Sequence, residues 1–269
     1  MLSLQAVERI ASRRNPLVLR CRAAARGDDP ALLLDGQHLV HEALSAGLSI
    51  PSVLVLDDAL ARNGFARLSD ELRERGARVF AASAAVMAAA SPVRSASPIV
   101  ALAHRPAVAP DGPYRGETPV VLIACDVQDP GNLGAVIRVA EAAGASGVVT
   151  AGTGADPFSW KALRGSMGSA LRLPVCRHGT AAAAVEEARR HGCRIVAAVP
   201  RGGTSLFEAD LTGALALLFG GEGAGLDPAL VEGSDVRVSI PMQPPVESLN
   251  AAVAAALVAY EATRRRSRR

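Results

Sequence analysis

The sequence contains very little lysine and few aromatic residues. Lys161 is the only lysine in the chain, and Phe, Trp and Tyr together make up 3% of its 269 residues. RNA-binding sheets that stack bases depend on exposed Phe or Tyr side chains, so this composition disfavours modules of that kind.

Long apolar runs are absent as well. The longest uninterrupted run, Ala251–Tyr260, is far shorter than the roughly 20 residues that a membrane-spanning helix needs. Near the N-terminus, Glu8 and Arg9 stand where a signal peptide would carry its apolar segment. We therefore expect a cytoplasmic protein without a membrane partner.

Metal-ligand patterns are lacking too. Four cysteines occur without a C-x-x-C pair and without a histidine at zinc-site spacing, namely Cys21, Cys125, Cys176 and Cys193. We expect them to be reduced structural thiols. His38 and His41 lie three residues apart beside Glu42, but no third ligand has suitable spacing. A histidine pair on a helix surface is the better interpretation, and no metal is expected.

What is present indicates a globular chain of two α/β domains. Hydrophobic residues make up 49% of the chain and charged residues 20%, which is compatible with packed cores. Residues 106–118 are rich in proline and glycine and show no apolar period. They predict a linker between a domain at 1–105 and a domain at 119–269.

Strands and helices alternate on both sides of this linker. In the first domain we expect strands at 32–34, 53–56, 78–81 and 99–103, helices at 37–46 and 65–75, and an alanine-rich helix before the last strand. In the second we expect strands at 120–124, 148–150, 195–199 and 215–219, and helices at 129–144, about 181–191 and about 248–265. The apolar strands of the second domain predict a mostly parallel sheet covered by helices.

Positive charge is concentrated at the two ends of the chain. Residues 1–26 hold six arginines, Arg13 and Arg14 among them, against one acid, and the last six residues hold five arginines and no acid. Because the net charge of the chain is only +3, the residues between the ends are net acidic. Basic ends on an acidic body favour contact with an extended polyanion, RNA above all, although a solvated basic tail accounts for the charge equally well.

Three glycine-containing turns follow predicted strands of the second domain. They are Asp129–Gly134, Gly152–Gly154 and Gly220–Gly225. Such turns hold phosphates or nucleotides in open α/β sheets, but none of the three matches G-x-G-x-x-G or a P-loop. The dinucleotide oxidoreductase and ATPase interpretations thereby lose their best support.

Taken together, the segments around these turns resemble a known family. In order and spacing, residues 126–148, 215–227 and 236–261 are similar to the three signature motifs of the SpoU (TrmH-like) RNA 2′-O-ribose methyltransferases of the SPOUT superfamily. Residues 160–175 resemble the segment that connects those motifs, and residues 31–105 resemble the small ribosomal-protein-like RNA-binding domain of members directed at rRNA.

The resemblance implies an α/β fold with a C-terminal methyltransferase domain that is threaded into a deep trefoil knot. It implies S-adenosylmethionine as the cofactor, and a homodimer with each active site at the interface. The positions matching the family's cofactor site are Gly220, Ile240 and Leu249, through backbone groups, with Met242 beside them. Glu222 is a negative partner for the cofactor's cationic sulfonium, a dimer-interface residue, or a solvated acid of the turn.

The resemblance also assigns catalytic positions. Arg138 matches the arginine proposed to activate the ribose 2′-hydroxyl. A guanidinium is effectively always protonated, so we favour stabilisation of a developing alkoxide, or a grip on the adjacent phosphate, over a role as base. The remaining catalytic matches are Asn132, Glu222, Ser248 and Asn250, of which the last two are also explained as helix caps. Arg164 and Ser166 match positions near the RNA phosphate.

We therefore predict an S-adenosylmethionine-dependent RNA 2′-O-methyltransferase, with rRNA favoured over tRNA by family analogy alone. One alternative is a tRNA 2′-O-methyltransferase, and another is a non-catalytic RNA-binding protein that retains the fold. Base methylation of tRNA guanine by a SPOUT enzyme is a further alternative, disfavoured by the Asn132, Glu222 and Ser248–Asn250 set. A Rossmann-type methyltransferase is also disfavoured, because the glycine-rich turn with an acidic residue that follows the first strand in that class is missing from this sequence.

Overall fold

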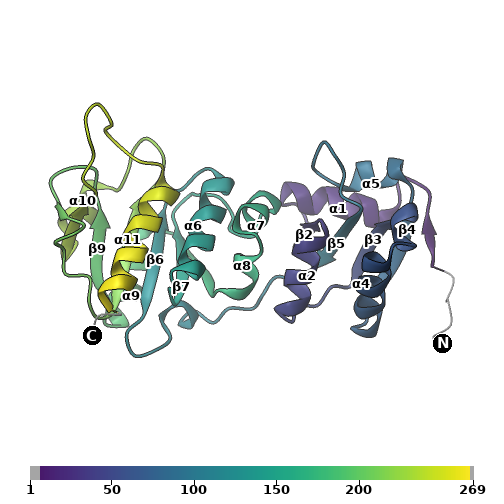
Figure 1. Cartoon of the computed structure of the whole chain (residues 1–269), viewed down its shortest axis with the longest axis horizontal. Helices are drawn as coiled ribbons and strands as arrows, with labels where there is room; N and C mark the ends of the chain where they lie inside the picture. The colour runs from purple at the N-terminus through teal and green to yellow at the C-terminus, as the bar shows by residue number, and fades with distance from the viewer. Residues whose placement is uncertain (1–6, 267–269) are drawn as a thin grey trace. The chain divides into compact units, whose positions relative to one another are not determined.

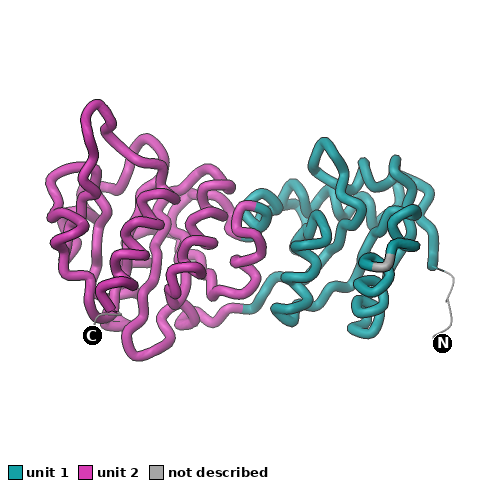
Figure 2. The backbone as a smooth tube through the Cα atoms, viewed as in Figure 1, with its two compact units in different colours: residues 1–107, 158–164 teal, residues 108–157, 165–269 magenta. Residues whose placement is uncertain are grey.

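The computed structural model describes residues 7–266, apart from the side chain of Asn63. The chain forms two compact units (Figure 2). Unit 1 comprises residues up to Ala107 together with Phe158–Arg164, and unit 2 comprises Val108–Pro157 together with the residues from Gly165 onward. The outermost parts of the two predicted domains, residues 1–6 and 267–269, lie outside the described residues.

Unit 1 is built on a five-stranded sheet in the order β1-β4-β3-β5-β2 (Figure 1). The strands are β1 (Arg9–Ile10), β2 (Leu32–Asp35), β3 (Ser52–Leu56), β4 (Arg78–Ala82) and β5 (Ile99–Ala103). The helices are α1 (Pro16–Arg26), α2 (Gln37–Ser45), α3 (Asp57–Leu60), α4 (Asn63–Glu74) and α5 (Ala84–Ala90). Strand β5 is antiparallel to both β2 and β3, whereas β4 is parallel to β1 and β3. The predicted strands and helices of this domain are confirmed to within two residues.

One hydrophobic core of unit 1 lies between the sheet and the pair α1 and α5. Asn15 caps α1, because its side chain accepts a hydrogen bond from the Leu17 N–H at 2.9 Å. Trp160, from a segment predicted to belong to the catalytic domain, packs against this same core. The partly buried indole explains why Phe158–Arg164 is part of unit 1.

Unit 2 is built on a seven-stranded sheet in the order β10-β12-β9-β11-β6-β7-β8, in which every pairing is parallel. The strands are β6 (Val120–Cys125), β7 (Gly147–Ala151), β8 (Val175–His178), β9 (Arg194–Ala198), β10 (Thr204–Ser205), β11 (Leu215–Gly220) and β12 (Val236–Ser239). The helices are α6 (Pro130–Ala142), α7 (Trp160–Ser166), α8 (Ser169–Arg172), α9 (Ala181–Arg190), α10 (Pro228–Glu232) and α11 (Ala251–Arg266), with α7 crossing from unit 1. The predicted parallel sheet is confirmed, and β8, β10 and β12 were not predicted.

Much of the segment predicted as a linker is packed into unit 2. Residues Gly112–Tyr114 form a short 3₁₀ helix, η1, whose three residues are buried. The Tyr114 ring stacks on the His191 ring with their centroids 4.5 Å apart. Only the first part of the proline-rich stretch therefore lies outside unit 2.

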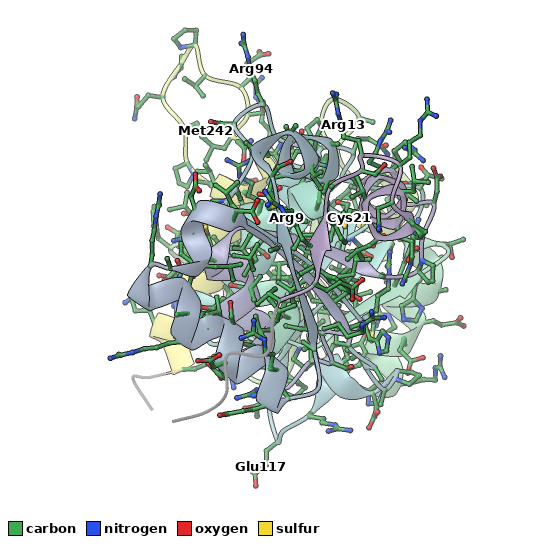
Figure 3. All side chains as sticks on the ribbon, turned by 90° about the vertical axis from the view of Figure 1, so that its right-hand side faces the viewer. Arg9, Arg13, Cys21, Arg94, Glu117 and Met242 are labelled. Carbon is green, nitrogen blue, oxygen red and sulfur yellow. The ribbon has the colours of Figure 1, made fainter. Side chains whose placement is uncertain are left out.

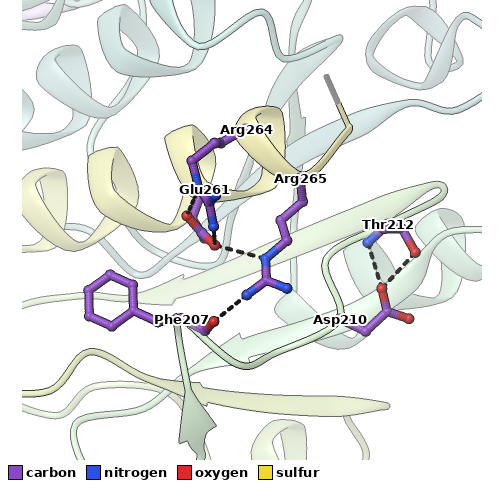
Figure 4. Close-up of polar contacts among 6 residues, drawn as sticks. All are labelled: Phe207, Asp210, Thr212, Glu261, Arg264 and Arg265. Atoms are coloured by element: carbon purple, nitrogen blue, oxygen red, sulfur yellow. Dashed lines mark hydrogen bonds and ion pairs between the residues drawn. The ribbon is translucent and has the colours of Figure 1, made fainter. Parts of the chain in front are cut away.

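The arginines at the end of α11 are engaged within the chain (Figure 4). Arg264 and Arg265 both donate to the Glu261 carboxylate, and Arg265 also donates to the Phe207 carbonyl. The hydrogen bonds from Arg264 are the main reason why the pKa of Glu261, which is 8% exposed, is lowered to about 2. Arg266 donates to Thr118 just before β6. Arg265 and Arg266 thereby connect the end of α11 to other segments of its unit, whereas Arg264 pairs within the helix. The rest of the basic tail lies outside the described residues.

Candidate functional site

The candidate site lies at the carboxyl ends of β6 and β11, which are neighbours in the middle of the unit 2 sheet. Strands β7 and β8 extend the sheet beside β6, and strands β9, β12 and β10 extend it beside β11. The order of strands therefore reverses between β6 and β11, and ligands of open α/β sheets bind outside the strand ends at such a point. The start of α6 follows β6, and the Gly220–Gly225 turn follows β11.

A chain of side-chain hydrogen bonds connects this turn to the starts of two helices. The Asn132 Nδ2 donates to Glu222 Oε1 at 2.6 Å, and the Asn250 Nδ2 donates to Asn132 Oδ1 at 2.9 Å. Because a carboxylate only accepts, Asn132 must turn its amide nitrogen to Glu222 and its oxygen to Asn250, which gives the chain one direction. The chain thus joins α6, the glycine turn and α11, which are far apart in the sequence.

Each residue of the hydrogen-bond chain is also tied to the backbone. Asn250 Oδ1 accepts from the Ala252 N–H at 2.9 Å, so Asn250 caps α11. The Asp129 side chain accepts from the Asn132 N–H at 2.7 Å, which confirms the predicted cap of α6. The helix caps therefore orient both asparagines toward the turn.

Glu222 holds a negative charge in this arrangement. Its second oxygen accepts from the Gln128 N–H at 3.2 Å. Partial burial acts to raise the pKa of Glu222, but hydrogen bonds from the Asn132 side chain and from neighbouring backbone N–H groups outweigh it and hold that pKa below its ordinary value. The carboxylate is thus ionised at neutral pH, and both of its oxygens accept hydrogen bonds.

The glycine turn brings backbone segments into direct contact. A Cβ on Gly220 would lie 2.1 Å from the carbonyl carbon of Gly225, and a Cβ on Gly221 would lie 2.1 Å from the Asp126 carbonyl oxygen. Only glycine allows such close approach. The turn therefore folds back on itself and rests on the end of β6.

A cavity of about 550 Å³ opens beside the turn. Its lining includes all four residues predicted to bind the cofactor, which are Gly220, Ile240, Met242 and Leu249, and three of the predicted catalytic residues, which are Glu222, Ser248 and Asn250. Phe219, Leu226 and Val238 add apolar surface to it. The cavity thus gathers residues from the β11 turn, from the segment after β12 and from the start of α11.

The predicted start of the last helix was wrong by three residues. Helix α11 begins at Ala251, and Ser248 lies in the preceding loop, where it is exposed. Capping by Asn250 leaves Ser248 outside the helix. Ser248 therefore has no capping role, although it lines the cavity.

Arg138 lies apart from the hydrogen-bond chain. It is exposed on α6, six residues after Asn132, or roughly 9 Å further along the helix axis. It does not line the cavity, and no hydrogen bond or ion pair joins its guanidinium to another residue between 7 and 266. Its charge is thus available to an anionic ligand.

The residues predicted to contact RNA differ in exposure. Arg13 and Arg14 are exposed in the loop before α1, and Arg164 is exposed on α7. Ser166 is completely buried, and its Oγ accepts from the Ala170 N–H at 3.4 Å. A direct contact of the Ser166 side chain with RNA, as its motif predicted, is incompatible with this buried position.

Asp126 is a residue of the site that the sequence did not single out. It directly follows β6 and has a φ of 52°, a left-handed value that is unusual for a non-glycine residue. Its Oδ1 accepts from the Thr153 N–H and hydroxyl, and its backbone carbonyl accepts from the side-chain Nε2 of Gln128. Asp126 thereby connects the ends of β6 and β7 next to the glycine turn, and the sequence contains no pattern that would indicate this backbone conformation.

Glu222→Gln tests whether the carboxylate stabilises the site. The amide nitrogen of glutamine cannot accept from the Gln128 N–H. With the exposure of Glu222 to solvent allowed for, we expect the free energy of unfolding to fall by about 1 kcal/mol and the Tm by about 2–4 °C. Because the folded-state pKa is depressed, this contribution exists above the ordinary carboxyl pKa and is lost as the pH falls through the lowered value. Thermal unfolding of both proteins from about pH 7 to pH 3 should show the Tm difference shrinking toward acid. A difference independent of pH would contradict the role of the charge.

Among residues 7–266, no group of three or more His, Cys, Asp or Glu side chains is placed to hold a metal ion. No helix in that range has the length and apolar character needed to cross a membrane. All four cysteines are free.

A parallel α/β unit with a cavity at its switch point, bordered by a glycine turn and a fixed carboxylate, defines an α/β enzyme that binds a small cofactor. The SpoU rRNA Methylase family model matches residues 119–260. The chain is 35% identical over 228 residues to the 23S rRNA (guanosine(2553)-2′-O)-methyltransferase RlmP of Bacillus subtilis, covering 85% of this chain and 86% of that protein. The chain belongs to the SpoU rRNA methylase family, as its motifs predicted.

Two solved structures resemble the chain over nearly its whole length. An AdoMet-bound rRNA methyltransferase from Sinorhizobium meliloti is 28% identical with a TM-score of 0.83, covering 96% of this chain and 97% of that one. The SpoU methyltransferase AviRb from Streptomyces viridochromogenes, in complex with AdoMet, is also 28% identical, with a TM-score of 0.81, covering 93% and 98%.

Proposed function

We propose that this chain transfers a methyl group from S-adenosylmethionine to the ribose 2′-hydroxyl of a nucleotide in ribosomal RNA. The observation that carries the proposal is the directional Asn250–Asn132–Glu222 chain beside a cavity lined by every residue predicted to bind the cofactor. The names of the relatives support it, since RlmP is named as a 23S rRNA 2′-O-methyltransferase and two similar structures hold AdoMet or form a complex with it.

The cavity fits S-adenosylmethionine. Its volume of about 550 Å³ falls within the range of roughly 300–1,000 Å³ that is usual for cofactor pockets. Backbone groups of Gly220, Ile240 and Leu249 would hold the cofactor's polar edges, and the Met242 side chain would cover it. Glu222 would supply a negative charge beside its cation. When bound, S-adenosylmethionine supplies an electrophilic methyl group.

Arg138 acts on the RNA side of the reaction. A guanidinium with a pKa above about 12 does not serve as a base at neutral pH. Arg138 stabilises the negative charge that develops on the attacking ribose oxygen, or holds the adjacent phosphate, and so lowers the barrier electrostatically. Arg138 is exposed and has no partner among the described residues, which suits either role.

Unit 1 holds the RNA substrate, as the ribosomal-protein-like domain of the family does. Arg13, Arg14 and Arg164 are exposed in this unit and are the contacts we propose for RNA phosphates. Phosphate contacts of this kind bind through charge and are weakened by salt.

Unit 2 contains the deep trefoil knot in its C-terminal part. The segment after β12 returns to the β11 turn, since Ile240, Met242 and Ser248–Ala251 line the same cavity as Gly220–Leu226. Helix α11 then packs against α6 and β11 (Figure 1). The return of the chain end to earlier segments supports such threading, which is rare among proteins.

The enzyme works as a homodimer through an apolar stripe on α11. Val253, Leu257 and Tyr260 follow helical spacing and are 47%, 42% and 52% exposed. Leu257→Asp is expected to reduce the mass in sedimentation equilibrium from twice the 27.6 kDa chain mass to that of one chain. Leu19→Asp is the matched control, because Leu19 is 48% exposed on α1. A dimeric Leu257→Asp variant would exclude this stripe as the interface.

Mapping of 2′-O-methyl groups in cells with and without the gene tests the proposed substrate. Loss of a methyl group from one rRNA position supports the proposal. Loss from a tRNA instead would show the tRNA 2′-O-methyltransferase alternative. If every methyl group persists while the protein binds RNA, the chain is a non-catalytic RNA-binding protein.

A further inference from the structure

The arginines of unit 1 fall into two groups. Many are paired with carboxylates, as in Arg9–Asp57, Arg20–Asp29, Arg73–Asp70, Arg75–Glu71 and Arg78–Glu8. Others have no such pairing, and Arg22 and Arg94 are among them: no hydrogen bond or ion pair joins their guanidinium groups to any residue between 7 and 266. Positive charge is therefore uncompensated at these two positions.

Arg94 sits on a loop that a single carboxylate holds at both ends. This loop, Ser91–Pro98, connects α5 to β5 and is called the Arg94 loop here. Asp35, the last residue of β2, accepts from the Ser91 hydroxyl at 2.5 Å and from the Ser97 hydroxyl. Arg94 is exposed between the two anchors and projects outward in Figure 3. Asp35 thus holds both ends of the loop, but its carboxylate does not form an ion pair with Arg94.

Arg22 lies on a groove beside the base of the same loop. The groove has a volume of about 340 Å³ and lies between α1 and the end of α5. It is lined by Arg22, Ala25 and Arg26 on one side and by Ala88–Pro92 on the other. No carboxylate is among these lining residues, so two arginines face a floor of small side chains.

The acids nearest in sequence do not cancel this charge. Asp29 is held by Arg20 at 3.0 Å. Asp28 pairs with Arg26 at 2.8 Å, but both side chains are about 60% exposed. Exposed pairs of this kind contribute little, so a phosphate can take the place of Asp28.

We propose that the Arg94 loop and the α1–α5 groove form the surface on which unit 1 binds the RNA backbone. Arg22 and Arg94 contact phosphates, Arg26 joins them, and Asp35 positions Arg94 by holding Ser91 and Ser97. The aliphatic groove floor takes the sugar side of the strand. This inference rests on the proposed function, since it assumes that RNA is the substrate.

A double variant with a matched control tests the surface. Arg22→Ala combined with Arg94→Ala removes two charges from it. The control combines Arg62→Ala with Arg67→Ala. Arg62 precedes the first residue of α4 and Arg67 lies within that helix; both are exposed, and neither guanidinium has a partner among residues 7–266. Affinity for an unmodified 23S rRNA transcript is measured for both variants and the wild type between about 0.05 and 0.3 M salt.

We expect the Arg22 and Arg94 variant to bind RNA on the order of tenfold more weakly at 0.15 M salt. The slope of log affinity against log salt should fall by about 1.5, as for two lost phosphate contacts. The control variant should match the wild type, and all three proteins should bind S-adenosylmethionine equally. Equal RNA affinity of the two double variants would overturn the proposal.

Ser97→Ala tests the anchoring role of Asp35. It removes one of the two hydroxyls that hold the loop and leaves every arginine in place. Weaker RNA binding with an unchanged salt slope supports a positioning role, whereas a lower Tm with unchanged RNA affinity would show a purely structural one. If the wild type methylates RNA but the Arg22 and Arg94 variant binds it normally, this inference alone fails. If the wild type neither binds nor methylates RNA, the proposed function fails with it.

Discussion

Arg138→Ala is expected to lower kcat for methyl transfer to RNA on the order of 10²-fold or more. Arg138 lies on α6, outside the cavity, and its guanidinium has no partner among residues 7–266. Its loss would therefore remove a positive charge from the side of the site where we propose that RNA binds, while the cofactor pocket keeps its shape. Affinity for S-adenosylmethionine should change little.

Two further variants sharpen this test. Arg138→Lys should be nearly as slow, because an ammonium group lacks the planar fork of donors of a guanidinium. Arg237→Ala is the matched control, since Arg237 is an exposed arginine on β12 of the same unit. Single-turnover transfer and calorimetric cofactor binding are measured for each protein. Wild-type rates in Arg138→Ala would remove Arg138 from the chemistry, and lost cofactor binding would make it part of the pocket.

Gly220→Ala is expected to weaken S-adenosylmethionine binding by 10²-fold or more. The new Cβ would lie 2.1 Å from the Gly225 carbonyl carbon and 2.4 Å from the Leu226 nitrogen. Both are backbone atoms, so the turn has to open. Overpacking of this kind costs about 1–3 kcal/mol of stability in addition to the lost pocket.

Gly223→Ala serves as the control, because it introduces backbone strain in the same turn without the steric clash of Gly220→Ala. Gly223 lies in the same turn with a φ of +87°, and a Cβ there would meet nothing within 4 Å. We expect it to lose about 1 kcal/mol of stability while it keeps most of its cofactor affinity. Calorimetry for the two variants, with circular dichroism as a check of folding, gives the comparison. Normal cofactor binding by Gly220→Ala would contradict the assignment of the cavity.

Strong local patterns accounted for most of the fold before the structure. The apolar runs of β6 and β11 predicted buried parallel strands, and Asp129 followed by Pro130 predicted the start of α6. Strand β12 lacked such a signal, because Arg237 interrupts its short apolar run and is exposed. Trp160 was placed in the wrong unit, since nothing local shows which core covers an indole.

The site was predicted as a set of residues but not as an arrangement. Asn132 and Glu222 are separated by 90 residues, and only the pairing of β6 with β11 brings them together. Ser166 was expected at the RNA because of its place in a motif, and its burial follows from packing that the motif does not encode. The arginines at the end of α11 were counted as free charge, whereas Glu261 holds two of them.

One measurement tests the central claim most directly. The purified chain is incubated with S-adenosylmethionine carrying a labelled methyl group and an unmodified 23S rRNA transcript, and the RNA is then hydrolysed with alkali. A 2′-O-methyl group blocks cleavage of its own phosphodiester, so we expect the label in an alkali-resistant dinucleotide. Label recovered only in mononucleotides, as a methylated base would give, would contradict the account, and so would RNA that carries no label.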